Sequence, residues 1–386
     1  MKVYILIFIL IIYVFSGDPE RVGSTSINFS KNPQTTGINA INSIGFSNLI
    51  VSSVAEISHA NPASLCNFSQ PSLGLLFNYA PPQNIFYSYK LKRTKQYLPY
   101  SAGFVYPISN ICLAVGYHKK YSHSIDLGEI PLTTIEEPEG TGITFSPKFI
   151  AELHSLSFSG CYNYSNLFMN DDNISVGLQM DVDYLYVKEQ VSSVAAKVSD
   201  MGLSGKLGLN YKFSDFISFG ILYSKGSYIK SEMEYEGSGL EEQISTDSST
   251  IYLNMESINQ KYVFELPDKF SYGFFTVPFK RFYFSLTISH IFWNRINSYF
   301  DNSIDISSNV IYKVPYSRID LTCGIFDRKE NSDLFDFNND LFFLNFGIRQ
   351  NFNNSAISVD ISDGYNSSWD RLDQYFLSLN ADFIFN

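Results

Sequence analysis

The feature that most constrains this chain is a long alternation of apolar and polar residues with a period of two. Every second residue from Ile174 to Tyr186 is apolar, and the residues between them are mainly Ser, Gly, Gln and Asp. The same pattern runs through 203–213 and through the last segment, 375–385. Successive side chains of a strand point to opposite faces, so these segments predict strands with one apolar and one polar face.

Strand length separates two folds that share this pattern. Strands of a soluble antiparallel sandwich usually have about five or six residues, whereas several of these segments reach about the 9–11 residues that a tilted strand needs to cross a bilayer. The alternation therefore predicts an all-β fold, a transmembrane antiparallel β-barrel. Its apolar face would meet lipid and its polar face would line a wet lumen.

We expect about 14 strands, an even number that is typical of outer-membrane barrels. The expected ranges are 84–92, 99–107, 110–119, 153–164, 173–188, 203–213, 216–225, 268–278, 281–293, 303–312, 317–326, 341–352, 355–363 and 374–385. Segment 71–79 also alternates, and it is either plug structure or a first strand.

The connections between these strands fall into two sets. The short set is 108–109, 165–172, 214–215, 279–280, 313–316 and 353–354. The long set includes 120–152, 226–267 and 327–340, with a hairpin expected around Ile251 to Phe264. Such barrels have short periplasmic turns and long outer loops, which places both ends of the barrel on the periplasmic side.

The N-terminus predicts export. Lys2 precedes thirteen apolar residues, Val3 to Phe15, and small residues follow them. This is the pattern of a signal peptide, expected at 1–17. The run is too short to span a bilayer comfortably, and a tilted anchor helix is the alternative.

The segment between the signal peptide and the barrel has a different character. Residues 18–70 are rich in Ser and Asn and lack a sustained period of two, so we expect a plug segment at 18–80 and the barrel at 81–386. A short helix is expected from Val54 to Ala60, because the proline of Asn61-Pro62 disfavours helix in the preceding residue. A barrel of this size otherwise has a lumen to fill or keep open.

Charge and reactive side chains exclude several functions. The chain has 27 basic and 38 acidic residues, a net charge of −11, and no basic stripe, so nucleic acid is not an expected partner. Acidic residues gather in the long loops, which are either solvated loops or a partner-binding surface. The five histidines carry no catalytic motif, and we expect no enzyme activity, no cofactor and no metal. The four cysteines match no metal motif, and a disulfide of Cys66 remains open.

Three motifs resemble a known family. Gly45-Phe46-Ser47-Asn48 is followed by Asn61-Pro62-Ala63-Ser64-Leu65 just before the first strands, and Leu266-Pro267-Asp268-Lys269-Phe270 enters a later strand. Together they resemble the plug and hairpin signatures of FadL/TodX-type outer-membrane transporters and of their PorV-type relatives. The resemblance covers roughly 40–386. The sequence departs from the pattern at its last residue, Asn386, where the aromatic residue stands one place earlier.

The resemblance implies a plugged barrel for passive uptake of long-chain fatty acids or other hydrophobic small molecules. The alternative is a PorV-like part in protein secretion or surface attachment, with an exported protein as partner. Both imply the outer membrane of a Gram-negative bacterium, contact with the bilayer and lipopolysaccharide, and a monomer.

Two sets of residues are candidates for a role in uptake. A carboxylate headgroup would need a cation, and the inward candidates are Lys206, Lys212 and Arg349, each of which could equally be an ordinary lumen charge. In the plug motif of Gly45, Asn61, Pro62 and Ala63, we expect Asn61 to hold a turn by binding its own backbone and Pro62 to fix the geometry.

Overall fold

The computed structural model describes most of the expected barrel and part of the plug. The described residues are 53–80, 84–87, 89–92, 96–126, 130–131, 144–145, 147–166, 172–191, 194–214, 216–232, 234–236, 261–296, 302–329, 341–366 and 371–385. The expected signal peptide and Gly45 lie outside them. No helix within these ranges is long and apolar enough to cross a membrane.

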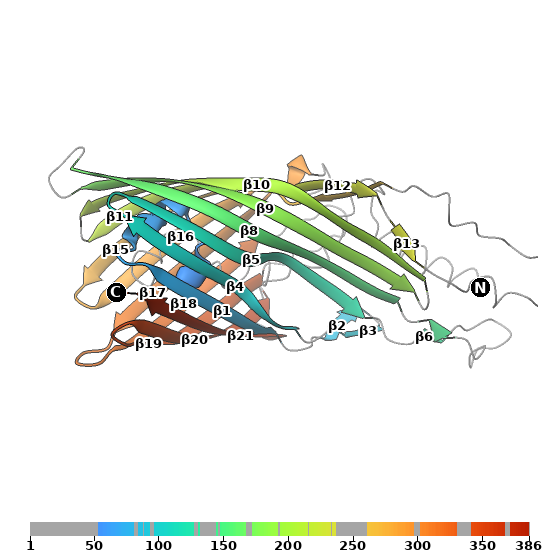
Figure 1. Cartoon of the computed structure of the whole chain (residues 1–386). Helices are drawn as coiled ribbons and strands as arrows, with labels where there is room; N and C mark the ends of the chain where they lie inside the picture. Colours follow the sequence, from blue (N-terminus) through green and yellow to red (C-terminus); the bar gives the residue numbers. More distant parts are fainter. Residues whose placement is uncertain are drawn as a thin grey trace, which may run out of the picture.

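Within the described residues, fourteen antiparallel strands form a closed wall (Figure 1). In chain order they are β1 (Ser72–Ala80), β4 (Gln96–Ile108), β5 (Ile111–Asp126), β8 (Pro147–Ser165), β9 (Asn173–Val191), β10 (Val194–Ser214), β11 (Ile217–Lys225), β15 (Lys269–Phe279), β16 (Phe282–Ile291), β17 (Ser303–Lys313), β18 (Ile319–Lys329), β19 (Leu341–Asn351), β20 (Ser355–Asn366) and β21 (Arg371–Ile384). The predicted fold class and strand number are confirmed.

The first strand is not the one we expected. Ser72–Ala80 pairs with β21 on one side and β4 on the other, so it closes the wall and does not belong to the plug. The expected first strand, 84–92, is instead a small hairpin of β2 (Asn84–Tyr87) and β3 (Tyr89–Lys92). The Pro81-Pro82 pair separates the two, and proline cannot donate a ladder hydrogen bond. The plug therefore ends before 72, not at 80.

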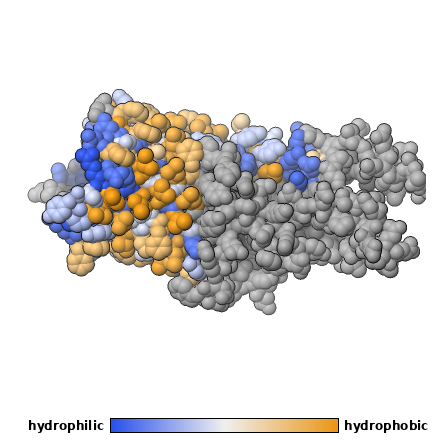
Figure 2. Space-filling view, turned by 90° about the horizontal axis from the view of Figure 1, so that it is seen from below, coloured by the Kyte–Doolittle hydropathy of each residue, from blue (hydrophilic) through white to orange (hydrophobic). Residues whose placement is uncertain are grey.

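The two faces of the wall differ as the alternation predicts. On β9, Val176, Leu178 and Met180 are 40%, 64% and 52% exposed on the outer face, while Gln179 and Asp181 are buried on the inner face. Figure 2 shows the outer apolar residues as a broad surface with hydrophilic residues at one end. An apolar outer face and a polar interior are what a bilayer-spanning barrel requires.

Aromatic side chains mark the two edges of the apolar band. Near the short turns the exposed aromatic residues are Tyr106, Tyr162, Tyr164, Phe213, Phe216, Phe279, Phe282, Tyr316 and Phe352. At the other edge Tyr184, Tyr223 and Tyr272 are exposed. From Ile174 to Tyr184 a strand tilted by about 45° rises about 23 Å, close to the apolar height of such barrels.

The short and the long connections between strands lie at opposite ends of the barrel, as expected. The short turns and the C-terminus lie at one end of the barrel, and the long strands β8, β9 and β10 project at the other end (Figure 1). Four of the short turns place a non-glycine residue at positive φ: Ser109, Asn166, Arg281 and Tyr316. The hairpin expected in the 226–267 loop pairs β12 (Tyr228–Glu232) with β14 (Lys261–Glu265), so it uses the two ends of the loop. Residues 251–260 of the expected range lie outside the described residues.

Candidate functional site: the plug and the lumen

The described part of the plug is two short 3-10 turns inside the wall, η2 (Val54–Glu56) and η3 (Pro62–Asn67). The expected helix from Val54 to Ala60 is thus shorter than predicted, and it ends before Asn61 as predicted. Asn61 caps η3, because its side-chain oxygen accepts a hydrogen bond from the Ala63 amide at 3.0 Å. This local bond confirms the turn expected at Asn61-Pro62.

Asn61 also joins the plug to the wall. Its side-chain amide donates to the carbonyl oxygens of Leu209 at 3.2 Å and Ile221 at 3.1 Å, which belong to β10 and β11. One buried side chain thus satisfies a plug amide and two wall carbonyls. The sequence predicted the first of these roles and gave no sign of the second, because the partners lie about 150 residues away.

The η2 end of the plug is held by the strands where the barrel closes. Asp382 of β21 accepts hydrogen bonds from the Val54 amide at 2.8 Å and the Ser53 hydroxyl at 3.1 Å. On β4, Ser101 donates to the Ala55 carbonyl oxygen at 2.7 Å. These contacts depend on the same closure that brings β21 beside β1.

The wall offers the plug a glycine-lined surface, which we call the glycine seat. Its members are inward residues of five strands, and a Cβ on any of them would overlap the plug: Gly74, Gly103, Gly116, Gly177 and Gly208. At Gly74, Gly103 and Gly177 the nearest plug atoms are backbone atoms, whereas at Gly116 and Gly208 they belong to the side chains of Ser58 and Asn61. Only glycine permits such a close approach.

A disulfide adds a covalent link. Cys66 at the end of η3 is bonded to Cys161 on the inner face of β8. The pairing left open by the sequence is thus between plug and wall. It is compatible with an exported protein, because disulfides persist in oxidising compartments.

Between the plug and the long loops, a β-bulge in β5 makes two consecutive residues, Lys120 and Tyr121, face the lumen. On β5, Lys119 pairs with His154 and Tyr121 pairs with Leu153, which leaves Lys120 without an opposite residue. A bulge of this kind redirects a side chain. Lys120 continues the inward alternation of Cys112, Ala114, Gly116 and His118, and the bulge turns the next residue, Tyr121, to the same side.

Lys120 lies in a compact polar layer. Its ammonium group is 3.3 Å from Asp181, 3.2 Å from Asp183 and 2.5 Å from the Ser204 hydroxyl. Asp183 also accepts a hydrogen bond from Ser227, the residue before β12. The layer therefore connects the wall to the inward-folded hairpin, and it places two carboxylates against the ammonium group of Lys120.

The plug contributes to the same layer. The Ser58 carbonyl oxygen accepts from Gln179 at 3.0 Å and from the ammonium of Lys206. His59 stacks on Tyr100 with ring centroids 5.4 Å apart. Burial, followed by the charge of Lys206, lowers the pKa of His59 to about 3, so this histidine is neutral at physiological pH.

The three predicted cations all point toward the lumen side of the wall but do not converge. Lys206 binds the Ser58 carbonyl of the plug. Arg349 lies 3.3 Å from Asp382, the carboxylate that holds η2. Lys212 is on β10, six residues nearer the short turns than Lys206. A ligand-binding role for any of them stays a prediction.

Nearer the long loops than the polar layer, the inward side chains are apolar, and we call this cluster of residues the apolar compartment. Its inward residues follow the polar ones on the same strands, as Leu185 follows Asp183. The buried members are Tyr121, Ala151, Leu153, Leu185, Val187, Val198, Ile229, Tyr262 and Phe264, and Leu266 and Trp293 pack against them. Three of the buried members come from the β12–β14 hairpin, so a loop that sequence reasoning placed outside the barrel completes its interior.

Comparisons with known proteins bear on the fold. No protein-family model matches the chain, and no curated protein matches it in sequence. Among solved structures, the Ralstonia pickettii toluene transporter TbuX matches with a TM-score of 0.61 at 11% identity, over 90% of this chain and 99% of that one. The CymD monoaromatic hydrocarbon channel matches with a TM-score of 0.56 at 13% identity, over 90% of this chain and 98% of that one. A Pseudomonas aeruginosa FadL homologue matches with a TM-score of 0.56 at 14% identity, over 86% of this chain and 94% of that one. The chain therefore shares the barrel fold of these proteins, as its motifs suggested.

Proposed function

We propose that this chain is an outer-membrane channel for passive uptake of hydrophobic small molecules. The observation that carries the proposal is the apolar compartment, a cluster of buried apolar side chains that the wall and the β12–β14 hairpin form inside a plugged barrel. Binding sites for small ligands are typically concave and mainly apolar, with few polar groups. The names of the structural relatives, a toluene transporter and a monoaromatic hydrocarbon channel, support the same class of ligand.

The polar layer favours a ligand without a carboxylate. Lys120 is already balanced by Asp181 and Asp183, and Lys206 is bound to a plug carbonyl. A buried carboxylate without a cation of its own would cost several kcal/mol. We therefore infer that uncharged aromatic or aliphatic compounds bind better than fatty acids.

Ligand titration tests this proposal with Trp293 as the reporter, since its side chain packs against the apolar compartment. We expect toluene to change the fluorescence of the detergent-purified barrel saturably, and oleate to bind at least tenfold more weakly. Ala151→Leu enlarges a buried side chain of the apolar compartment, so it should weaken toluene binding at least tenfold. Val176→Leu on the lipid-facing side of β9 is the matched control.

Two results would contradict the proposal. Tighter binding of oleate than of toluene would refute the preference for uncharged ligands. No saturable response to either ligand, together with a stoichiometric exported protein that copurifies with the barrel, would favour the secretion alternative.

A further inference from the structure

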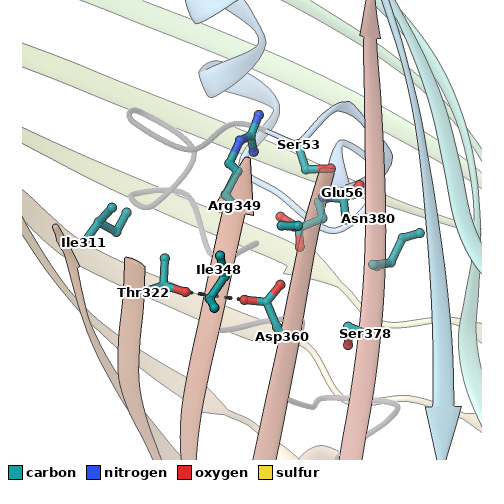
Figure 3. A pocket seen from close by; sticks show the side chains of 11 residues that line it. Ser53, Glu56, Ile311, Thr322, Ile348, Arg349, Asp360, Ser378 and Asn380 are labelled. Carbon is teal, nitrogen blue, oxygen red and sulfur yellow. Dashed lines mark hydrogen bonds between the residues drawn. The ribbon is translucent and has the colours of Figure 1, made fainter. Parts of the chain in front are cut away.

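A small cavity with polar and apolar lining lies between the η2 end of the plug and the strands β17 to β21 (Figure 3). Its volume is about 20 Å³, which is room for about one water-sized particle. It is lined mainly by oxygen-bearing side chains, among them Glu56 of the plug and Asp360, Ser378 and Asn380 of the wall. Its size excludes a hydrophobic ligand.

Charges around this cavity are not balanced. The cavity carries the carboxylates of Glu56 and Asp360, and Asp382 lies next to them. Arg349 is the cation at the cavity, and it is paired with Asp382 at 3.3 Å. Two carboxylates therefore remain for which no ion pair exists among the described residues.

Two buried oxygens at the cavity have no hydrogen-bond partner in the described part of the chain. They are Oε2 of Glu56 and Oδ1 of Asn380, and their residues are 4% and 5% exposed. Buried polar atoms without partners are rare and need an explanation such as an ion. Both atoms are acceptors, so a donor or a cation would satisfy them.

We propose that the cavity binds one hard cation of the Ca²⁺ class between Glu56 of the plug and Asp360 of β20. Ca²⁺ prefers carboxylate, amide and water oxygens at about 2.3–2.6 Å in flexible geometry, whereas Mg²⁺ demands near-ideal octahedral geometry. No three His, Cys, Asp or Glu side chains in the described ranges converge as a metal site. Neutral oxygens, from Asn380, nearby serines and water, would therefore complete the shell.

The position of the cation gives it a mechanical role. The disulfide fixes η3 to β8, while η2 is held to the wall by hydrogen bonds and apolar packing, without a covalent link among the described contacts. A cation shared by Glu56 and Asp360 would lock the half of the plug that the disulfide leaves unlinked. Removing it would loosen η2 and leave η3 in place.

Equilibrium binding of ⁴⁵Ca²⁺ to the EDTA-treated, detergent-purified barrel tests the inference. We expect one site per chain with a Kd on the order of 10⁻⁴–10⁻³ M, the range of extracellular calcium modules, and at least tenfold weaker competition by Mg²⁺. Glu56→Gln and Asp360→Asn should each weaken binding at least tenfold. Asp305→Asn, a buried lumen carboxylate on β17 outside the cavity, is the control.

Two outcomes would overturn it: no Ca²⁺ binding up to 10 mM (about ten times the weakest expected Kd), or binding that both variants leave unchanged. If the variants fail to fold, the thermal stability of the native barrel decides, because a ligand that binds only the folded state raises the melting temperature. We expect Ca²⁺ to raise the melting temperature of the EDTA-treated barrel more than Mg²⁺ at the same concentration. Equal melting temperatures with and without Ca²⁺ would contradict the site. Neither measurement involves a hydrophobic ligand, so the proposed channel function can fail or hold separately.

Discussion

Gly177→Ala is the sharpest test of the glycine seat. A Cβ at this position would lie 2.6 Å from the Pro62 carbonyl oxygen and closer still to the backbone of Ala63. Ordinary contact distances are about 3.5 Å, so the plug backbone must retreat by about 1 Å. A backbone cannot rotate away as a flexible side chain can.

The consequence can be estimated from the neighbouring contacts. A retreat of about 1 Å would stretch the Asn61 bonds, now 3.2 and 3.1 Å, beyond hydrogen-bond range. Two lost hydrogen bonds cost about 1–3 kcal/mol, and overpacking of one methyl group costs about the same. We therefore expect a free energy of unfolding lower by about 2–6 kcal/mol and a larger ion conductance, because the plug no longer seals against β9.

Denaturant unfolding in detergent and single-channel conductance in planar bilayers measure the two effects. Gly160→Ala on β8 is the matched control, since its nearest neighbour, a Leu113 methyl, is 3.7 Å away and leaves room for a Cβ. If Gly177→Ala is as stable and as tightly closed as the native barrel, the backbone-on-backbone seat is refuted.

Three further predictions follow from the plug. Replacing Cys66 and Cys161 by serine should lower the free energy of unfolding by about 2–5 kcal/mol, because the bond closes a loop of 95 residues; an unchanged midpoint in urea would contradict this. Asn61→Asp keeps the acceptor for the Ala63 amide and loses both donors to the wall, so it should lower the free energy of unfolding by about 1–3 kcal/mol. Asn61→Ala also loses the cap and should lower it by about 0.5–2 kcal/mol more, whereas equality of Asn61→Asp with the native barrel would show that only the cap matters. In EDTA, the raised pKa of Glu56 means that the folded state binds the proton more tightly, so stability should fall as pH rises above about 4.5 through the raised pKa. Glu56→Gln should flatten this pH dependence in thermal melts, and an unchanged slope would contradict the assignment.

Much of the wall could be predicted because its determinants are local. Alternation fixes which side chains face lipid, and thirteen of the expected strands overlap observed wall strands. The exception, 84–92 in place of 72–80, arose because both segments alternate and only pairing with the last strand distinguishes them.

The site was less predictable because its contacts join distant segments. Asn61 could be assigned a local turn, but its wall partners on β10 and β11 are set by the barrel. The inward position of Tyr121, next to the inward Lys120, depends on a bulge that breaks the alternation. The inward glycines are visible in the sequence as small residues, yet nothing in the sequence says that the plug backbone lies against them.

The disulfide between plug and wall also bears on the order of assembly. Cys161 is 3% exposed and faces the lumen, and its partner lies in the plug that fills the lumen. Thiol oxidation requires access to the attacking thiolate, and a periplasmic oxidase could not reach either sulfur once the wall has closed. We therefore expect the bond to form while β21 has not yet joined β1, so that the chain reaches the membrane insertion machinery with its plug already fastened inside the half-built wall.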